Sequence, residues 1–295
     1  MKKIEICIPN GSMEKTITNL FANAGLEVIV ERKRKNEGKI NVPWIDYVSF
    51  HRPQEIPDYL DRGFFDVAFI GEDWIADWGY NFPTLLKLPI GRNGTKAVRI
   101  VLAVRKDSGF EKVEDLPKGC IVSTEYVRLT TRFLSKIGRK DIQVMFSFGN
   151  TEQKIKFGAA AIVDIMESGE SLRENNLIVI SELMESAIVI AVNPKSYCDK
   201  EKQSYIDCLV ALIKGAYQAS QYVFLVANVP QKSLTEASQI MGGLKGPTCS
   251  ALTVENWFAL QSIVLRKDEQ KVIFKLLQIG VTDIVVNREI PLIMN

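Results

Sequence analysis

The sequence predicts an α/β protein with two lobes and a smaller C-terminal domain of the ferredoxin-like type. Strand and helix patterns alternate from the first residues and form two consecutive units of the same kind. The apolar segment Ile188–Val192 follows the second unit and is predicted to return as a strand toward the first. The last 74 residues, 222–295, follow the order β-α-β-β-α-β, which is the ferredoxin-like arrangement.

The first lobe is predicted to span residues 1–98 and to be completed by residues 187–221. Apolar residues at helical spacing follow the first strand, and Gly25 ends that helix. The charged segment that follows is predicted to form a hairpin with its turn at Asn36-Glu37-Gly38 and a solvated basic cluster, Arg32-Lys33-Arg34-Lys35. Other predicted elements are the strands Ile4–Pro9, Leu26–Glu31, Tyr47–His51 and Phe65–Ile70, a helix that begins at Pro53, and a helix over about Lys200–Gln221.

The second lobe is predicted to span residues 99–186, and the C-terminal domain residues 222–295. Two α/β lobes joined by a returning chain imply a cleft between them. The second lobe is expected to contain the strands Ile100–Arg105, Ile121–Ser123, Ile142–Ser147 and Ala160–Asp164, and a helix that Gly138 ends. The C-terminal domain is expected to contain the strands Tyr222–Ala227, Thr248–Leu252, Trp257–Leu265 and Asp283–Val286, and the helices Gln231–Met241 and Asp268–Gln278.

The composition excludes several classes of function. Lys and Arg total 37 against 35 Asp and Glu, which argues against nucleic-acid binding through a concentrated basic surface. His51 is the only histidine, so a site of several histidine ligands is impossible. The five cysteines are odd in number and widely spaced, as is typical of a reducing compartment. The N-terminus does not have the pattern of a signal peptide, and no apolar run approaches the ~20 residues of a membrane helix. We therefore expect a cytoplasmic protein with no membrane partner.

The segment from Asp164 to Leu172 has the composition of a phosphate-binding turn. An apolar strand ends at Asp164, and Glu167-Ser168-Gly169-Glu170-Ser171-Leu172 follows as a loop that opens a helix. Gly169 allows the backbone to approach an anion, the serines offer hydroxyl groups, and the helix start presents free N–H groups. The carboxylate oxygens of Asp164 and Glu167 can accept hydrogen bonds from ribose hydroxyl groups or bind Mg²⁺. The alternative, which the motif alone favours, is a helix N-cap whose acidic residues complement the macrodipole.

Three further turns carry polar residues at the ends of predicted strands: Pro9-Asn10-Gly11-Ser12, Gly71-Glu72-Asp73 and Ser123-Thr124-Glu125-Tyr126. Each by itself is explained more simply as a capped turn, and Asp73 either caps the next helix or reaches into the cleft. Together with the loop after Asp164, they predict a cleft that binds a ligand with several phosphates. Arg52 is a better anion ligand than His51, because a guanidinium binds phosphate through two hydrogen bonds. His51 is interpreted as a structural residue.

The chain resembles the long, regulated form of the ATP phosphoribosyltransferase family over nearly its whole length. The most specific similarity is AIVDIMESGESLRENNL, residues Ala161–Leu177, which resembles the phosphoribosyl-pyrophosphate loop of that family. Supporting segments are IPNGSMEKTITNLFANAGL, FHRPQEIPDYLDRGFFDVAFIGED and STEYVRLTTRFL. The segment LKGPTCSAL, residues Leu244–Leu252, resembles the region in which the family binds its feedback inhibitor, histidine.

This resemblance implies a catalytic part with the fold of type II periplasmic binding proteins and a C-terminal ACT-like regulatory domain. It implies that a ring nitrogen of ATP attacks the anomeric carbon of phosphoribosyl pyrophosphate while pyrophosphate leaves on Mg²⁺, the first step of histidine biosynthesis. Such a reaction depends on alignment and charge neutralisation more than on a nucleophilic side chain. A homo-oligomer, either a dimer or a hexamer, is also expected.

The same resemblance implies the roles of individual residues. Catalytic roles are implied for Asp164, Glu167 and Arg52. Phosphoribosyl-pyrophosphate binding is implied for Asp164, Glu167, Ser168, Gly169, Glu170, Ser171 and Leu172. ATP binding is implied for Asn10, Gly11, Ser12, Arg52, Gly71, Asp73, Thr124 and Tyr126, and inhibitor binding for Thr248 and Ser250.

Five positions depart from the family pattern, two of them mildly, because Ser168 and Ser171 stand where threonine is usual and keep the hydroxyl groups. Asn10 and Ser12 stand where many members have Lys and Arg, so two positive charges are missing from a polyphosphate site. Ala160 replaces an aspartate that is common in the strand before the phosphate loop. Two alternatives therefore remain open: a non-catalytic, two-lobed sensor of small molecules, and a regulatory paralogue that binds histidine without turnover.

Overall fold

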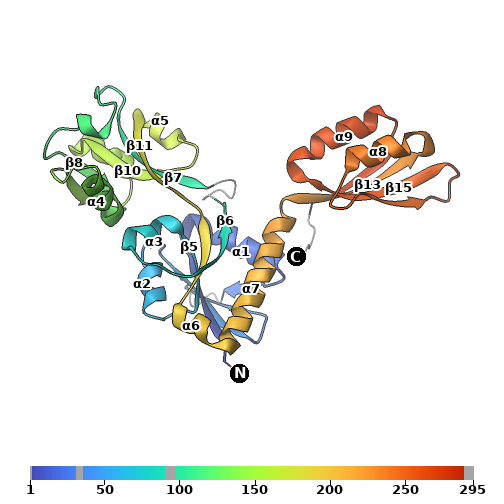
Figure 1. Cartoon of the computed structure of the whole chain (residues 1–295), viewed down its shortest axis with the longest axis horizontal. Coiled ribbons are helices and arrows are strands. Elements are labelled where there is room, and N and C mark those ends of the chain that lie inside the picture. Colours follow the sequence, from blue (N-terminus) through green and yellow to red (C-terminus); the bar gives the residue numbers. More distant parts are fainter. Residues whose placement is uncertain (1, 31–35, 91–96, 289–295) are drawn as a thin grey trace. The chain divides into compact units, whose positions relative to one another are not determined.

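A computed structural model describes residues 2–30, 36–90 and 97–288, which form two compact units (Figure 1). The first unit comprises Met1–Ala22 and Leu26–Val210, and the second comprises Asn23–Gly25 and Ala211–Asn295. The division falls within helix α7 (Lys200–Ala219), whereas the sequence places the start of the C-terminal domain after this helix. No helix in the described part of the chain is long and apolar enough to cross a membrane.

A seven-stranded sheet forms the first lobe, in the order β2-β3-β4-β1-β5-β12-β6. The central β1 runs parallel to β4 and β5, and β12 runs antiparallel to β5 and β6. The strands are β1 (Ile4–Pro9), β2 (Val28–Val30), β3 (Glu37–Ile40), β4 (Ile45–His51), β5 (Val67–Gly71), β6 (Thr84–Leu88) and β12 (Ile188–Val192). The α-helices are α1 (Glu14–Asn23), α2 (Ile56–Asp61), α3 (Glu72–Trp78) and α6 (Pro194–Cys198).

The predicted hairpin turn at Asn36-Glu37-Gly38 is wrong. Glu37 and Gly38 lie inside β3, which pairs antiparallel with both β2 and β4, so the expected second arm consists of two strands. Close packing explains the glycine, because a Cβ at Gly38 would lie 3.0 Å from Val28 Cγ1. A glycine that permits close approach of strands is easily mistaken for a turn residue. The basic cluster Arg32-Lys33-Arg34-Lys35 lies outside the described residues.

A five-stranded sheet forms the second lobe, in the order β11-β7-β10-β8-β9. Its elements are β7 (Val98–Arg105), β8 (Ile121–Thr124), α4 (Val127–Lys136), β9 (Gln143–Phe146), β10 (Ala161–Met166), α5 (Glu170–Glu174) and β11 (Leu177–Ser186). The sequence analysis missed β11. Two register shifts, one after Val179 and one after Glu182, interrupt the alternation of side chains by which a strand is recognised.

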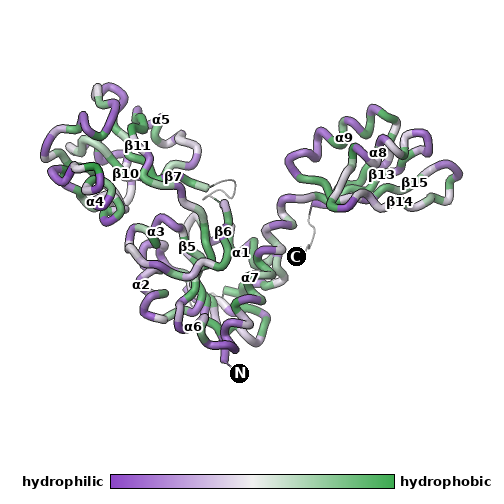
Figure 2. Tube along the Cα trace, viewed as in Figure 1, coloured by the Kyte–Doolittle hydropathy of each residue, from purple (hydrophilic) through white to green (hydrophobic). Residues whose placement is uncertain are grey.

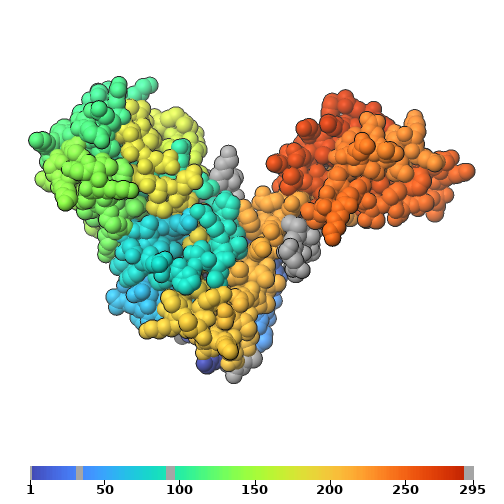
Figure 3. Space-filling view, viewed as in Figure 1, coloured from blue at the N-terminus to red at the C-terminus, as the bar shows by residue number. Residues whose placement is uncertain are grey.

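The chain returns to the first lobe between β11 and β12. Only Ala187 separates the last residue of β11 from the first residue of β12, although the two strands belong to different sheets. Every residue of β12 is buried, and the strand lies between β5 and β6. The predicted return strand is therefore confirmed. The space-filling view shows the two lobes in contact with each other (Figure 3).

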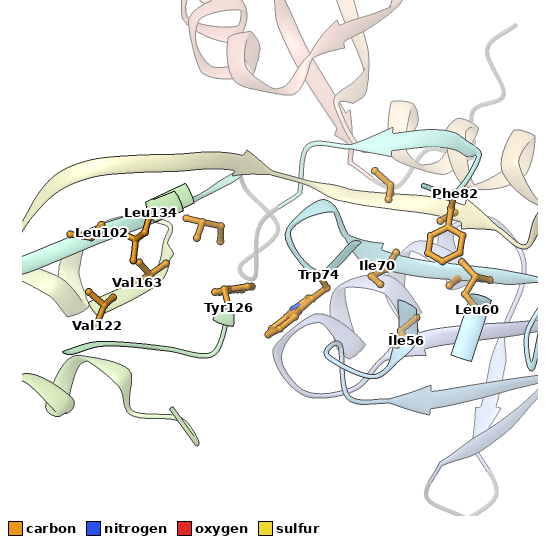
Figure 4. Close-up of a cluster of buried hydrophobic side chains, with 14 of the residues drawn as sticks. Ile56, Leu60, Ile70, Trp74, Phe82, Leu102, Val122, Tyr126, Leu134 and Val163 are labelled. Atoms are coloured by element: carbon orange, nitrogen blue, oxygen red, sulfur yellow. The ribbon is translucent and has the colours of Figure 1, made fainter. Parts of the chain in front are cut away.

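One cluster of buried apolar side chains extends through both lobes. Its strand segments, such as β5, are hydrophobic along their length (Figure 2). The close-up shows Trp74 and Tyr126 side by side, with Ile70 and its neighbours on one flank and Val163 and its neighbours on the other (Figure 4). The two rings stack with centroids 4.4 Å apart and planes at 29°. The two lobes thus share an apolar core that is centred on an aromatic pair.

The second unit has the predicted order β-α-β-β-α-β, which is confirmed. Its sheet has the order β14-β15-β13-β16. The elements are β13 (Tyr222–Pro230), α8 (Leu234–Met241), β14 (Thr248–Ala251), β15 (Trp257–Leu265), α9 (Glu269–Gln278) and β16 (Thr282–Asn287). Alternate residues of β13 are buried, and both helices contribute to the same core, α8 through Ala237 and α9 through Leu276.

Candidate functional site

The serine–glycine loop after β10 opens the short helix α5, and Gly169 is its N-cap residue. Gly169 has a φ of 73°, in the left-handed region that favours glycine. A Cβ at this position would also lie 3.3 Å from both Met166 Sδ and Arg173 Nη1. No side chain caps α5, but Glu170 lies in its first turn, as the alternative of an N-cap with acidic residues expects. The glycine is required here by both backbone conformation and space.

This loop lines an open hollow of about 370 Å³ in the second lobe. All the residues that the sequence assigned to phosphoribosyl-pyrophosphate binding line it: Asp164, Glu167, Ser168, Gly169, Glu170, Ser171 and Leu172. Glu125, from the predicted turn Ser123–Tyr126, also lines it, and three lining residues were not expected from the sequence: Asn150, Thr151 and Glu152. Thr151 and Glu152 belong to a 3-10 turn with no recognisable motif, so no local signal marks them. The loop is therefore accessible and not sealed within packed protein.

The two loop serines have different partners. Ser168 Oγ accepts a hydrogen bond of 3.3 Å from the backbone N–H of Glu170. Ser171 Oγ donates to the Glu152 carboxylate, which also lines the hollow. Both serines are exposed, so an anion in the hollow can compete for their hydroxyl groups.

The residues that line this hollow give it a strongly negative charge. Five carboxylates line it, from Glu125, Glu152, Asp164, Glu167 and Glu170, and no described lining residue is a lysine or an arginine. A polyphosphate placed here needs cations that these residues do not supply. In the described ranges, no three His, Cys, Asp or Glu side chains group closely enough to hold a metal ion. One or two carboxylates are nevertheless sufficient for Mg²⁺ when substrate phosphates and water complete its coordination.

A second hollow, of about 80 Å³, adjoins the first, because Ile165 lines both. Its walls are mainly apolar, and residues from both lobes contribute to them. Four residues that the sequence assigned to ATP binding line it: Ser12, Gly71, Asp73 and Tyr126. Asn10, Gly11, Arg52 and Thr124 are not among its lining residues. We call this second space the apolar hollow and the first the polar hollow.

Asp73 is the acidic group of the apolar hollow and is only 3% exposed. Its Oδ2 accepts a hydrogen bond of 2.6 Å from the Tyr126 hydroxyl, and its Oδ1 accepts one of 2.6 Å from the Ser186 hydroxyl. The side chain does not cap α3, so the interpretation that it reaches into the cleft is the one realised. A Cβ at Gly71 would lie 2.0 Å from Asp73 Oδ1. Gly71 therefore leaves room for this carboxylate.

Ser186 is a site residue that the sequence analysis missed. Its Oγ also accepts a hydrogen bond of 3.1 Å from the backbone N–H of Asp73. Two hydrogen bonds of opposite direction therefore join the serine and the aspartate. Ser186 is the last residue of β11, a strand that the sequence pattern does not reveal, and it carries no motif. Thr124 has an indirect role, because its buried Oγ1 accepts a 2.9 Å hydrogen bond from Tyr126 N–H.

His51 ends β4 and Arg52 follows it, but the two side chains differ in surroundings. Arg52 is exposed. The His51 ring lies 5.1 Å from the Tyr59 ring and 5.4 Å from the Phe65 ring, and its Nε2 is 2.8 Å from Ser49 Oγ. Burial lowers the pKa of His51. This environment satisfies the ring without a ligand, in agreement with the structural interpretation of the only histidine.

Helices α3 and α4 join the two lobes beside the apolar hollow. The Asp77 carboxylate accepts a 2.8 Å hydrogen bond from Leu129 N–H near the start of α4. In the opposite direction, Arg132 donates to the carbonyl oxygen atoms of Ala76 and Asp77 at the end of α3. Each helix thus supplies a side chain that satisfies free backbone groups of the other. Burial raises the pKa of Asp77.

Two family models match the chain. The model described as "ATP phosphoribosyltransferase" matches residues 52–215, and the model described as "HisG, C-terminal domain" matches residues 219–288. A protein of Geotalea uraniireducens named ATP phosphoribosyltransferase is 34% identical over 283 residues, with 94% of each chain covered. The chain belongs to the ATP phosphoribosyltransferase family. Another protein of that name, from Pelotomaculum thermopropionicum, is also 34% identical, with 96% of each chain covered.

A solved structure supports the same assignment. It is the ATP phosphoribosyl transferase (HisG:HisZ) complex from Thermotoga maritima, which is 27% identical with a TM-score of 0.61. The match covers 72% of this chain and 98% of that chain. The separate match to the C-terminal-domain model indicates the long form of ATP phosphoribosyltransferase. The family resemblance and the fold class expected from the sequence are both confirmed.

The predicted inhibitor residues of this family member lie in the second unit. Thr248 and Ser250 belong to β14, a strand at the edge of the sheet with all four residues exposed. A hollow of about 490 Å³ lies between α8, α9 and the end of β15, and neither residue is among those that line it. Their role in inhibitor binding stays a prediction.

Proposed function

We propose that this chain condenses ATP with phosphoribosyl pyrophosphate to form phosphoribosyl-ATP and pyrophosphate, the first step of histidine biosynthesis. The observation that carries the proposal is the junction of two unlike hollows at Ile165. The polar hollow suits a sugar phosphate, and the apolar hollow with its aromatic pair suits a purine ring. Two substrates bound in this way meet at the junction, where the new bond forms.

The residue roles in this proposal are those that the family resemblance implies. Ser168, Gly169 and Ser171 hold the 5-phosphate, and Asp164 and Glu167 face the ribose, where positive charge develops as pyrophosphate leaves. The exposed Arg52 and the loop Asn10-Gly11-Ser12 bind the triphosphate end of ATP. In each case the side chain aligns or neutralises a substrate and does not form a covalent bond with it.

Mg²⁺ is part of this proposal as a companion of the substrates. The carboxylates of the polar hollow are hard oxygen ligands, the type that Mg²⁺ prefers. Asp164 and Glu167 are the pair that the family resemblance places near the ribose. When bound, the ion neutralises charge on the leaving pyrophosphate. The negative lining of the hollow and the missing basic residues at Asn10 and Ser12 both support a need for it.

A direct assay tests the reaction. The protein is mixed with ATP, phosphoribosyl pyrophosphate, Mg²⁺ and pyrophosphatase, and the absorbance change of the modified adenine ring is followed. Asp164→Asn is expected to reduce kcat/KM by about a hundredfold or more, since it removes a charge at the developing cation. Asp107→Asn is the matched control, because Asp107 is an exposed aspartate of the same lobe that pairs with Arg105. A folded wild type that binds neither substrate contradicts the proposal.

The departures at Asn10 and Ser12 support a second candidate, a paralogue that binds histidine without turnover. The double variant Asn10→Lys with Ser12→Arg separates the two. An increase in turnover means that the rest of the cleft is competent, whereas an inactive variant favours the paralogue. A non-catalytic sensor is distinguished by calorimetry, because it binds a small metabolite without Mg²⁺-dependent affinity for phosphoribosyl pyrophosphate.

Regulation and assembly complete the proposal. Histidine binds the C-terminal unit near Thr248 and Ser250 and inhibits the reaction, and the chain forms a homo-oligomer, a dimer or a hexamer. The exposed edge strand β14 supports assembly, because an open sheet edge is readily covered by another chain. Light scattering after size exclusion, with and without histidine, tests the assembly, and a monomer in both conditions contradicts it. The assay above, repeated with histidine present, tests the inhibition. A cytoplasmic location is supported by the five unpaired cysteines.

A further inference from the structure

We propose that a hollow in the second unit binds a phosphate monoester with a flat, largely apolar body. The hollow has a volume of about 490 Å³ and lies between α8, α9 and the end of β15. We call it the C-terminal hollow. It shares no lining residue with the polar or the apolar hollow, and Thr248 and Ser250, the residues assigned to the inhibitor, do not line it. The inference is therefore independent of the reaction and of the predicted inhibitor contacts.

The floor of the C-terminal hollow is apolar. Side chains from three elements meet there: Ile240 and Met241 of α8, Ile263–Leu265 of β15, and Val272 of α9. At its margin, Leu244 is 56% exposed and Leu265 is 36% exposed. Covering such apolar surface with a ligand removes it from water, which is favourable. A flat ring that lies on this floor covers both leucines.

One wall of the hollow, the loop that follows α8, is fixed in place. Gly243 has a φ of 114°, and a Cβ at this position would lie 2.3 Å from Ser262 Oγ. The Ser262 hydroxyl donates a hydrogen bond of 3.0 Å to the carbonyl oxygen of Gly242, which joins the loop to β15. The glycine leaves room for the serine, and the serine holds the loop. The shape of the hollow is therefore formed before a ligand binds.

Two lysines one helical turn apart stand at the rim of the hollow. Lys271 and Lys275 lie on α9 at positions i and i+4, so they share one face of the helix. Within the described part of the chain, no residue forms an ion pair with either of them. A phosphate monoester carries nearly two negative charges at neutral pH and can pair with both lysines, whereas a carboxylate carries only one. The lysine pair therefore favours a phosphate.

Asp268 defines the orientation of the ligand. It is the only acidic residue among the described residues that line the hollow, and it lies seven positions before Lys275, about 10 Å along the helix. Its carboxylate repels a phosphate but accepts a hydrogen bond from an amine, an amide or a hydroxyl group. The phosphate therefore lies at the lysines, and a hydrogen-bond donor at the other end of the ligand faces Asp268.

Phenyl phosphate is the probe, and calorimetry on the whole chain near neutral pH measures its affinity. Inorganic phosphate tests the apolar floor, and phenylacetate tests the charge of the anion. Phenyl phosphate is expected to bind at least about tenfold more tightly than either, because inorganic phosphate covers no apolar surface and phenylacetate has a single charge. Equal affinity for phenyl phosphate and either of the other two anions overturns the inference.

The double variant Lys271→Ala with Lys275→Ala locates the site. It is expected to reduce the affinity for phenyl phosphate by about tenfold or more. Lys232→Ala with Lys267→Ala is the matched control, because it removes two exposed lysines of the same unit that do not line the hollow. Its affinity is expected to be unchanged. Unchanged binding in the first variant means that the probe binds elsewhere, an equal loss in the control means that only net charge matters, and either result overturns the inference.

Asp268→Asn gives a change in the opposite direction. Removal of the only negative charge among the described lining residues is expected to strengthen phenyl phosphate binding by about two- to threefold. A loss of structure cannot produce this gain, so the variant remains informative if the lysine variant does not fold by circular dichroism. Unaltered or weaker binding contradicts the orientation assigned to the ligand and overturns the inference.

Discussion

The polar and apolar hollows of the first unit differ in how their side chains are held. The polar hollow is built mainly from one continuous segment, Asp164–Leu172, to which Glu125 and the turn Asn150–Glu152 add their side chains. The apolar hollow is built from several distant segments that meet around the buried Asp73. The first is a local structure that a motif can reveal, and the second exists only after both lobes have packed. Substitutions at the two sites should therefore have different consequences.

The largest effect is expected for Trp74→Ala. Removal of a buried Trp side chain costs about 3–5 kcal/mol, and here it also removes the ring stacked 4.4 Å from Tyr126. Urea denaturation measures the loss of stability. The folded variant should lose ATP affinity and keep its affinity for phosphoribosyl pyrophosphate, whereas Trp74→Phe should retain most of both. Equal loss of the two affinities would mean that the hollows do not act separately.

The next effect is expected for Gly71→Ala. The new Cβ would lie 2.0 Å from Asp73 Oδ1, so the carboxylate must leave its two hydroxyl partners. Overlap of this kind costs about 1–3 kcal/mol of unfolding free energy, and ATP binding should fall with it. Gly109→Ala is the control, because its Cβ meets nothing within 4 Å and only its positive φ is strained. A variant as stable as the wild type, with normal ATP affinity, would show that the Asp73 contacts are dispensable.

Ser171→Ala probes the polar hollow and should have a smaller effect. Ser171 is exposed and its hydroxyl donates to Glu152, so its removal leaves stability nearly unchanged. Loss of one hydrogen bond to a phosphate is expected to raise the KM for phosphoribosyl pyrophosphate by about tenfold, with the KM for ATP unchanged. Steady-state kinetics with each substrate varied in turn measures both. A rise in the KM for ATP of the same size would break the proposed division between the hollows.

The smallest effect is expected for the pH dependence of stability that Asp77 causes. Burial raises its pKa above the ordinary value of 3.8, although hydrogen bonds from α4 oppose part of that rise. The folded protein binds this proton more tightly than the unfolded chain, so the free energy of unfolding falls as pH rises from 3.8 through the raised pKa. Asp77→Asn should remove this decline. Across the same pH interval, the unfolding free energy of the variant should therefore rise relative to that of the wild type by about 1 kcal/mol or less. Urea midpoints at several pH values measure it, and parallel curves would contradict the assignment.

Sequence reasoning succeeded where structure is local. The loop Ser168–Ser171, the order of the C-terminal elements and the return strand Ile188–Val192 all follow from short patterns that the chain carries in one place. It failed at β3 and β11, where a glycine and two register shifts altered the expected pattern. It also missed Glu152, which reaches the polar hollow from a turn 19 residues before Ser171.

The sequence by itself determined the kinds of elements, their order and the chemistry of the phosphate loop, because periodicity and turn residues act over a few neighbouring positions. Only the tertiary structure decided what Asp73 does. Its hydrogen-bond partners, Tyr126 and Ser186, lie 53 and 113 positions away along the chain. No local sequence pattern predicts contacts between residues so far apart, because burial and the shared core of the two lobes bring these groups together only when the whole unit folds.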